Sequence, residues 1–116
     1  MAKDDYFVIV YQILAYLYQR LKKCENIDSK MIKHDSPNLN INKRYWLYII
    51  DHLTEDGLIE GVIFADGLEG REPYDMSRCT ITPKGIAFLC ENSFMKKAVA
   101  FLKEAKEIIP FDIPLK

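Results

Sequence analysis

The stretch that decides the fold runs from Asn42 to Gly85 and is NKRYWLYIIDHLTEDGLIEGVIFADGLEGREPYDMSRCTITPKG. Asn42 is a favoured helix N-cap, and Ile41 is spaced from Trp46 as a hydrophobic staple. Apolar residues then recur at three- and four-residue steps, and Gly57 supplies a left-handed stop. The stripe expected to be buried on this helix is Tyr45, Trp46, Ile49, Ile50 and Leu53.

Two strands and a helix start complete the stretch. Residues 58–64 and 78–81 have the β-branched and aromatic content of strands. Residues 65–73 contain glycines and a proline, so we expect a mobile hairpin tip there rather than more sheet. Thr82 as N-cap with Pro83 at the first helical position marks a helix start, because proline lacks only an N–H that would be unpaired there. This order of elements predicts a winged helix-turn-helix with a two-stranded wing.

Further helices are expected on both sides of this stretch. The first begins near Asp4 or Asp5 and ends around residues 22–23, and its apolar surface exceeds what one small core needs. A short helix over residues 28–33 follows, capped by Asp28. After a break at Asn92, Ser93 can cap a last helix. The apolar stripe expected on that helix is Met95, Ala98, Leu102, Ala105 and Ile109.

The totals fit one α+β, mainly helical domain over residues 1–116. At 116 residues and 13.5 kDa the chain can bury one core. The net charge of −1 gives no bulk attraction to nucleic acid or to an anionic membrane, so any such binding needs a local patch. No secretory signal or membrane span is evident, so we expect a cytoplasmic protein.

Catalytic and metal-binding patterns are not evident in the chain. Cys24, Cys79 and Cys90 form no CxxC pair and lie far from His34 and His52, so we expect reduced, mostly buried thiols and no zinc site. There is no glycine-rich phosphate loop and no useful Cys/His spacing. We therefore expect no enzyme activity, no cofactor and no small-molecule substrate.

Double-stranded DNA is one expected partner. In helix-turn-helix proteins the N-terminal residues of the second helix face the bases, and here these are Lys43 and Arg44. Lys30 and Lys33 on the preceding short helix could meet phosphates, and Tyr48, one turn beyond Arg44, could reach a base edge or the backbone. The alternative is an ordinary solvated surface.

The next stretch opposes DNA binding. Arg71 is the one basic residue among the acidic residues Asp51, Glu55, Asp56, Glu60, Asp66, Glu69, Glu72 and Asp75. An acidic wing tip near the DNA backbone would be repelled. If DNA is bound, the wing should be held away or should touch it through Arg71 and Arg78 alone.

A protein-interaction module is the second hypothesis. The surplus apolar strip on the first helix and the stripe on the last are surfaces through which winged helices form homodimers. Both helices could instead pack inside one monomer. The acidic wing could also dock a basic protein.

Three segments carry a family resemblance: Asp4-Asp5-Tyr6-Phe7-Val8-Ile9, Tyr45-Trp46 through Gly57-Leu58-Ile59-Glu60-Gly61-Val62, and Ile81-Thr82-Pro83-Lys84-Gly85-Ile86 with Glu91-Asn92-Ser93. Together they resemble the YjcQ-like family of small proteins from Gram-positive bacteria and their phages. The resemblance implies a winged-helix fold and an association with mobile elements, and it defines no catalytic or ligand residues. A looser similarity links the pattern to MarR- and PadR-type regulators.

Overall fold

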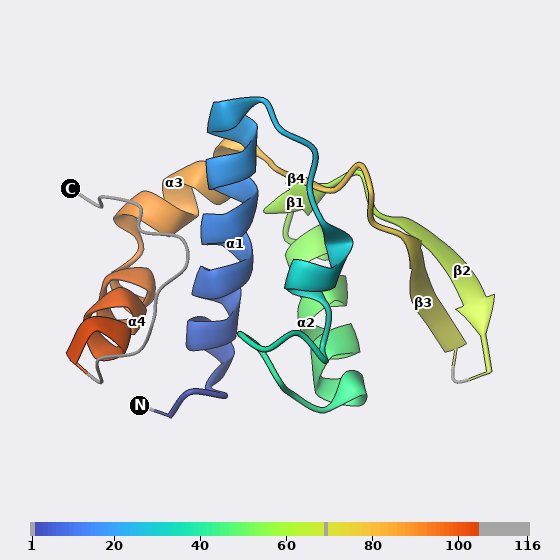
Figure 1. Cartoon of the computed structure of the whole chain (residues 1–116), viewed down its shortest axis with the longest axis horizontal. Coiled ribbons are helices and arrows are strands. Elements are labelled where there is room, and N and C mark those ends of the chain that lie inside the picture. Colours follow the sequence, from blue (N-terminus) through green and yellow to red (C-terminus); the bar gives the residue numbers. More distant parts are fainter. Residues whose placement is uncertain (1, 69, 105–116) are drawn as a thin grey trace.

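A computed structural model describes residues 2–68 and 70–104 (Figure 1). The last part of the expected C-terminal stripe, Ala105 and Ile109, lies outside the described residues. The fold is α+β and mainly helical, as predicted. Its elements are α1 (Tyr6–Lys23), the 3-10 helix η1 (Ser29–Ile32), α2 (Lys43–Glu55), β1 (Ile59–Glu60), β2 (Ile63–Gly67), β3 (Gly70–Asp75), β4 (Thr80–Ile81), α3 (Pro83–Glu91) and α4 (Ser93–Glu104).

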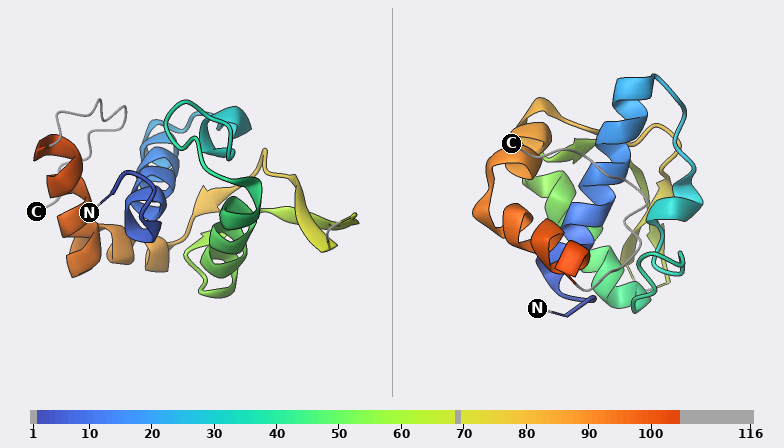
Figure 2. Two further views of the ribbon diagram at one scale, coloured as in Figure 1. Left: turned by 90° about the horizontal axis from the view of Figure 1, so that it is seen from below. Right: turned by 60° about the vertical axis from the view of Figure 1, so that its left-hand side comes forward.

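Helix α1 lies at the centre of the molecule. Figures 1 and 2 show it between the α3–α4 pair on one side and α2 with η1 on the other. Apart from Gln12, residues 8–17 of α1 are buried, and they contribute more residues to the hydrophobic core than any other described element. The surplus apolar strip of this helix therefore lies inside a single chain. No helix in residues 2–68 and 70–104 has the length and hydropathy that crossing a membrane requires.

The predicted ends of α2 are confirmed. The Asn42 side chain accepts a hydrogen bond from the Arg44 N–H at 2.8 Å. Gly57 has φ of +74°, and the Leu58 N–H donates to the Leu53 carbonyl at 2.9 Å, which is the hydrogen bond of a Schellman motif. The predicted stripe is buried except at Tyr45, which is half-buried because its hydroxyl reaches out to the Asp4 carbonyl; the buried members are Trp46, Ile49, Ile50 and Leu53.

The wing differs from the prediction. Sheet is present in the described residues 65–67 and 70–73, where none was expected, because β2 and β3 run through them as an antiparallel ladder that extends to Gly67 opposite Gly70. Pro73 is tolerated because each strand of a two-stranded ladder has an open edge.

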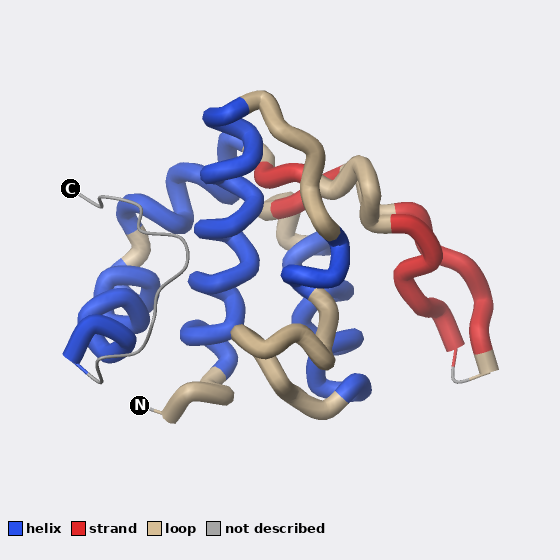
Figure 3. Tube along the Cα trace, viewed as in Figure 1, coloured by secondary structure: helices blue, strands red, loops and turns tan. Residues whose placement is uncertain are grey.

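The expected strand 58–64 is also interrupted. Ile59 pairs with Ile81 in a separate short ladder of β1 with β4. The break falls at Gly61, whose φ is +86° and where a Cβ would overlap the Arg78 carbonyl oxygen. Figure 3 shows the two strand pairs as separate segments joined by loop. The wing is thus one long hairpin with an inner ladder on the core and an outer ladder beyond it.

Two further details differ from expectation. The short helix over residues 28–33 is a 3-10 helix that ends at Ile32, although Asp28 caps it as predicted by accepting from the Lys30 N–H at 3.1 Å. At the last helix it is Asn92, not Ser93, whose side chain accepts from a backbone N–H, that of Phe94. Thr82 caps α3 as expected.

Candidate nucleic-acid interface

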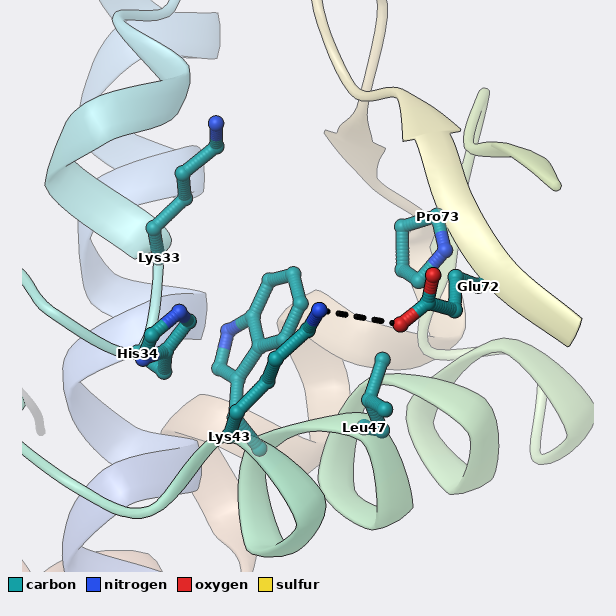
Figure 4. Close-up of a pocket in the computed structure, with 7 residues that line it drawn as sticks. Lys33, His34, Lys43, Leu47, Glu72 and Pro73 are labelled. Carbon is teal, nitrogen blue, oxygen red and sulfur yellow. Dashed lines mark ion pairs between the residues drawn. The ribbon is translucent and has the colours of Figure 1, made fainter. Parts of the chain in front are cut away.

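A shallow hollow lies where η1, α2 and the wing meet (Figure 4). Its volume is about 210 Å³. Lys33 directly follows η1, whereas Lys43 is the first residue of α2, and both line the hollow. The full lining is Lys33, His34, Lys43, Trp46, Leu47, Glu72 and Pro73.

Trp46 explains why these two lysines come together. Its indole N–H donates to the Ile32 carbonyl at 2.7 Å, and both the indole and Ile32 are buried. This bond ties the end of η1 to the first turn of α2, so that Lys33 and Lys43 face one hollow from separate elements. Trp46 is a packing residue, as its place on the stripe indicated, and it also positions the candidate site.

A second hollow of about 370 Å³ adjoins the first and shares Leu47 with it. It contains Arg44 and Tyr48, and its full lining is Arg44, Leu47, Tyr48, Asp51, His52 and Arg71. The Tyr48 ring is 56% exposed, so it can reach a ligand. It stacks on the His52 ring with centroids 4.1 Å apart, and His52 Nδ1 donates to the Tyr48 carbonyl at 2.9 Å. His52 is half-buried on α2, and it supports Tyr48.

The wing contacts α2 through two ion pairs. Lys43 Nζ lies 3.0 Å from Glu72 Oε1, and Arg71 Nη1 lies 3.7 Å from Asp51 Oδ1. The Arg71 guanidinium also lies over the Phe64 ring, 3.9 Å from its centroid. The outer ladder therefore contacts α2 through pairs of opposite charge.

The two wing arginines are placed differently. Arg71 lines the same hollow as Arg44, so it lies beside α2. Arg78 instead lines a third hollow with Arg20 and Cys24 near the C-terminal end of α1. Of the two arginines named from the sequence, only Arg71 lies beside the candidate DNA contacts.

The five candidate residues are all exposed, and four of them line the two adjoining hollows; Lys30 is exposed on η1 but lines neither. His34 lines the first hollow, with its ring 5.8 Å from that of Trp46. As part of the acidic wing, Glu72 was expected to repel DNA or to dock a basic protein, and its pairing with Lys43 was not predicted. No local pattern announces that contact, because the two residues meet only when the wing folds back on α2.

The thiols are free, and their environments differ. Cys79 is buried, and burial raises the pKa of its thiol to about 12, so the thiol stays protonated and unreactive. Cys90 is half-buried, but Cys24 is exposed, which departs from the expectation of mostly buried thiols. Cys24 caps α1 in a left-handed conformation, with φ of 54°, at the surface.

Comparison with protein families identifies the chain. The family model described as YjcQ protein matches residues 11–108. That match covers most of the chain, so the chain belongs to the YjcQ family, as the sequence resemblance indicated. No curated protein and no solved structure matches it.

Proposed function

For this member of the YjcQ family, we propose that the chain binds double-stranded DNA through the outer side of α2. The contact surface, called the α2 face below, consists of Lys33, Lys43, Arg44, Tyr48 and Arg71. The observation that carries the proposal is the convergence of Lys33 and Lys43, from two separate elements, on one hollow beside Arg44. Within a chain of net charge −1, this is the kind of local cationic patch that DNA binding requires.

The chemistry of the α2 face suits a duplex. Lys33 and Lys43 present ammonium groups at the edge of a hollow, where they can bind backbone phosphates. Arg44 lies at the exposed N-terminal turn of α2, and an arginine there can donate two hydrogen bonds to a guanine edge in the major groove. Tyr48 stands one turn further on, with its ring fixed by His52.

The acidic residues nearby weaken the proposal less than their number suggests. Glu72 and Asp51 neutralise Lys43 and Arg71 in the free protein. Both pairs are partly exposed to solvent, and ion pairs of this kind stabilise a folded protein by only about 0 to 1 kcal/mol. A polyanion with many phosphates can therefore compete for these cations, and its binding should depend strongly on salt.

The test is a titration of a mixed-sequence duplex with the purified protein, at low salt and again at higher salt. Binding should weaken steeply as salt rises. Lys43→Ala should reduce the affinity and lower the slope against salt by about one, because it removes a phosphate contact, whereas Arg44→Ala should reduce the affinity with little change in that slope. Lys96→Ala is the matched control, because Lys96 is exposed on α4, on the other side of α1 (Figure 1). An absence of binding at low salt contradicts the proposal, as does binding that neither α2 substitution changes.

The biological role that follows is that of a DNA-binding regulator. The association of YjcQ-like proteins with phages and mobile elements, implied by the resemblance, supports a regulator of such an element. Changes in transcription after deletion of the gene would test this role separately from DNA binding.

A protein-interaction module is the second candidate. The outer ladder exposes large apolar side chains, with Ile63 53% and Tyr74 79% exposed, and Phe94 on α4 is 44% exposed. Exposed apolar groups on a wing favour a protein partner over the DNA backbone. A homodimer through α1 and α4 would have to use surface outside their buried stripes, because those stripes pack within one chain. Sedimentation of the purified protein at several concentrations tests the homodimer, and a monomer at all concentrations contradicts it.

A further inference from the structure

The Glu72 carboxylate lies where an anionic ligand of the α2 face would bind. We infer that Glu72 occupies the Lys43 position in the free protein as an internal substitute for a DNA phosphate, and that the duplex displaces it on binding. This inference rests on the proposed function. It gives the acidic wing a role, which is to weaken and regulate binding at the same surface.

The first support is the chemistry of the contact. Glu72 Oε1 lies 3.0 Å from Lys43 Nζ, within the hollow that Lys33 also lines. Carboxylate and phosphate oxygens are the same kind of anionic acceptor for an ammonium group. Figure 4 shows the carboxylate directed from β3 toward the Lys43 ammonium group, across the opening of the hollow. A phosphate that binds Lys43 at this point must replace Glu72.

The second support is the way in which Glu72 is placed. Its carboxylate lies against Gly67 on the opposite strand, where a Cβ would overlap Oε2. The absence of a side chain at Gly67 therefore leaves room for the carboxylate in its present position. The atoms nearest to an added methyl group all belong to the flexible side chain of Glu72, so Gly67→Ala should displace the carboxylate and leave the ladder in place.

The third support is that the exchange is feasible. The outer ladder is separated from the core ladder by the break at Gly61. Its second ion pair with α2, between Arg71 and Asp51, is long at 3.7 Å, and both side chains are about half exposed. Glu72 can thus leave Lys43 without exposing the core.

The experiment compares the affinity of one duplex for Glu72→Gln and for Asp66→Asn. Asp66 is the matched control, because it is exposed on the same hairpin, carries the same charge and forms no ion pair with Lys43. Glu72→Gln should tighten binding about two- to fivefold more than Asp66→Asn, which is the range expected for loss of one solvent-exposed competing ion pair. Gly67→Ala should tighten binding in the same direction.

A double-mutant cycle locates the effect. In a Lys43→Ala background the extra gain from Glu72→Gln should vanish, because the residue for which Glu72 competes is absent. Equal gains from Glu72→Gln and Asp66→Asn, or a gain that persists without Lys43, overturn the inference and leave the proposed function standing. An absence of duplex binding by every variant at low salt overturns both.

Discussion

Gly85→Ala should destabilise the protein, although helix propensity alone predicts the reverse. Gly85 is buried in the first turn of α3, and alanine in a helix is more favourable than glycine by about 1 kcal/mol. A Cβ at this position, however, would overlap the Leu58 carbonyl oxygen and lie 2.7 Å from Ile81 Cγ1. Helix α3 therefore packs on the inner ladder of the wing at a distance that only glycine permits.

The magnitude follows from which atoms could move. The Leu58 carbonyl is backbone, and it accepts a hydrogen bond from the Thr82 N–H at 3.1 Å. Overpacking costs about 1 to 3 kcal/mol, and loss of that hydrogen bond adds about 1 kcal/mol. After the gain in helix propensity is subtracted, the net loss should be about 2 kcal/mol.

The assay is urea unfolding followed by the fluorescence of Trp46, the single tryptophan. The midpoint should fall with little change in the slope m, and Tm should drop by roughly 8 °C for a domain of this size. Ala87→Gly on the exposed side of α3 is the control, and it should cost about 1 kcal/mol through propensity alone. A Gly85→Ala protein as stable as the natural one, or more stable, refutes the packing argument.

Two other substitutions test the core. Trp46→Phe keeps a ring in place but leaves the buried Ile32 carbonyl without its indole donor. The free energy of unfolding, measured by circular dichroism, should fall by about 1 to 2 kcal/mol. A fall of less than about 0.5 kcal/mol would mean that this hydrogen bond does not stabilise the fold. Burial raises the pKa of the Cys79 thiol from 9.0 to about 12, so the unfolded chain loses this proton at a lower pH than the folded chain does. The contribution of the protonated thiol to the free energy of unfolding is therefore complete below about pH 9 and is lost as the pH rises toward 12. Between about pH 9 and 10.5 the stability of Cys79→Ala should therefore decline less steeply than that of the natural protein, and equal slopes would contradict this.

The parts of the fold that could be predicted are those set by local chemistry. The caps at Asn42 and Thr82 and the stop at Gly57 depend on side-chain and backbone groups a few residues apart, so their residue types alone identify them. The helix stripes follow in the same way from the spacing of apolar residues. These local signals were enough to predict the order of the helices and strands.

The parts that could not be predicted depend on contacts between distant segments. The break at Gly61 falls where the chain passes the Arg78 carbonyl in the turn between β3 and β4, and no local pattern reveals this approach. The pairing of Lys43 with Glu72 requires the wing to fold back on α2. The number of acidic residues in the sequence could therefore predict repulsion between the wing and DNA, but not this contact. All five candidate residues are exposed, and only the structure showed that four of them line two adjoining hollows whereas Lys30 does not. Their role in DNA binding stays a prediction.

The central position of α1 has a consequence for synthesis on the ribosome. The helix is made before α3, α4 and β4, yet its buried face packs on all three. Until those segments emerge, ten consecutive positions from Val8 to Leu17, apolar except for Gln12, lack most of their final partners. The nascent chain therefore carries an uncovered apolar helix until these later segments emerge, which makes this segment a natural target for chaperones that bind exposed apolar segments.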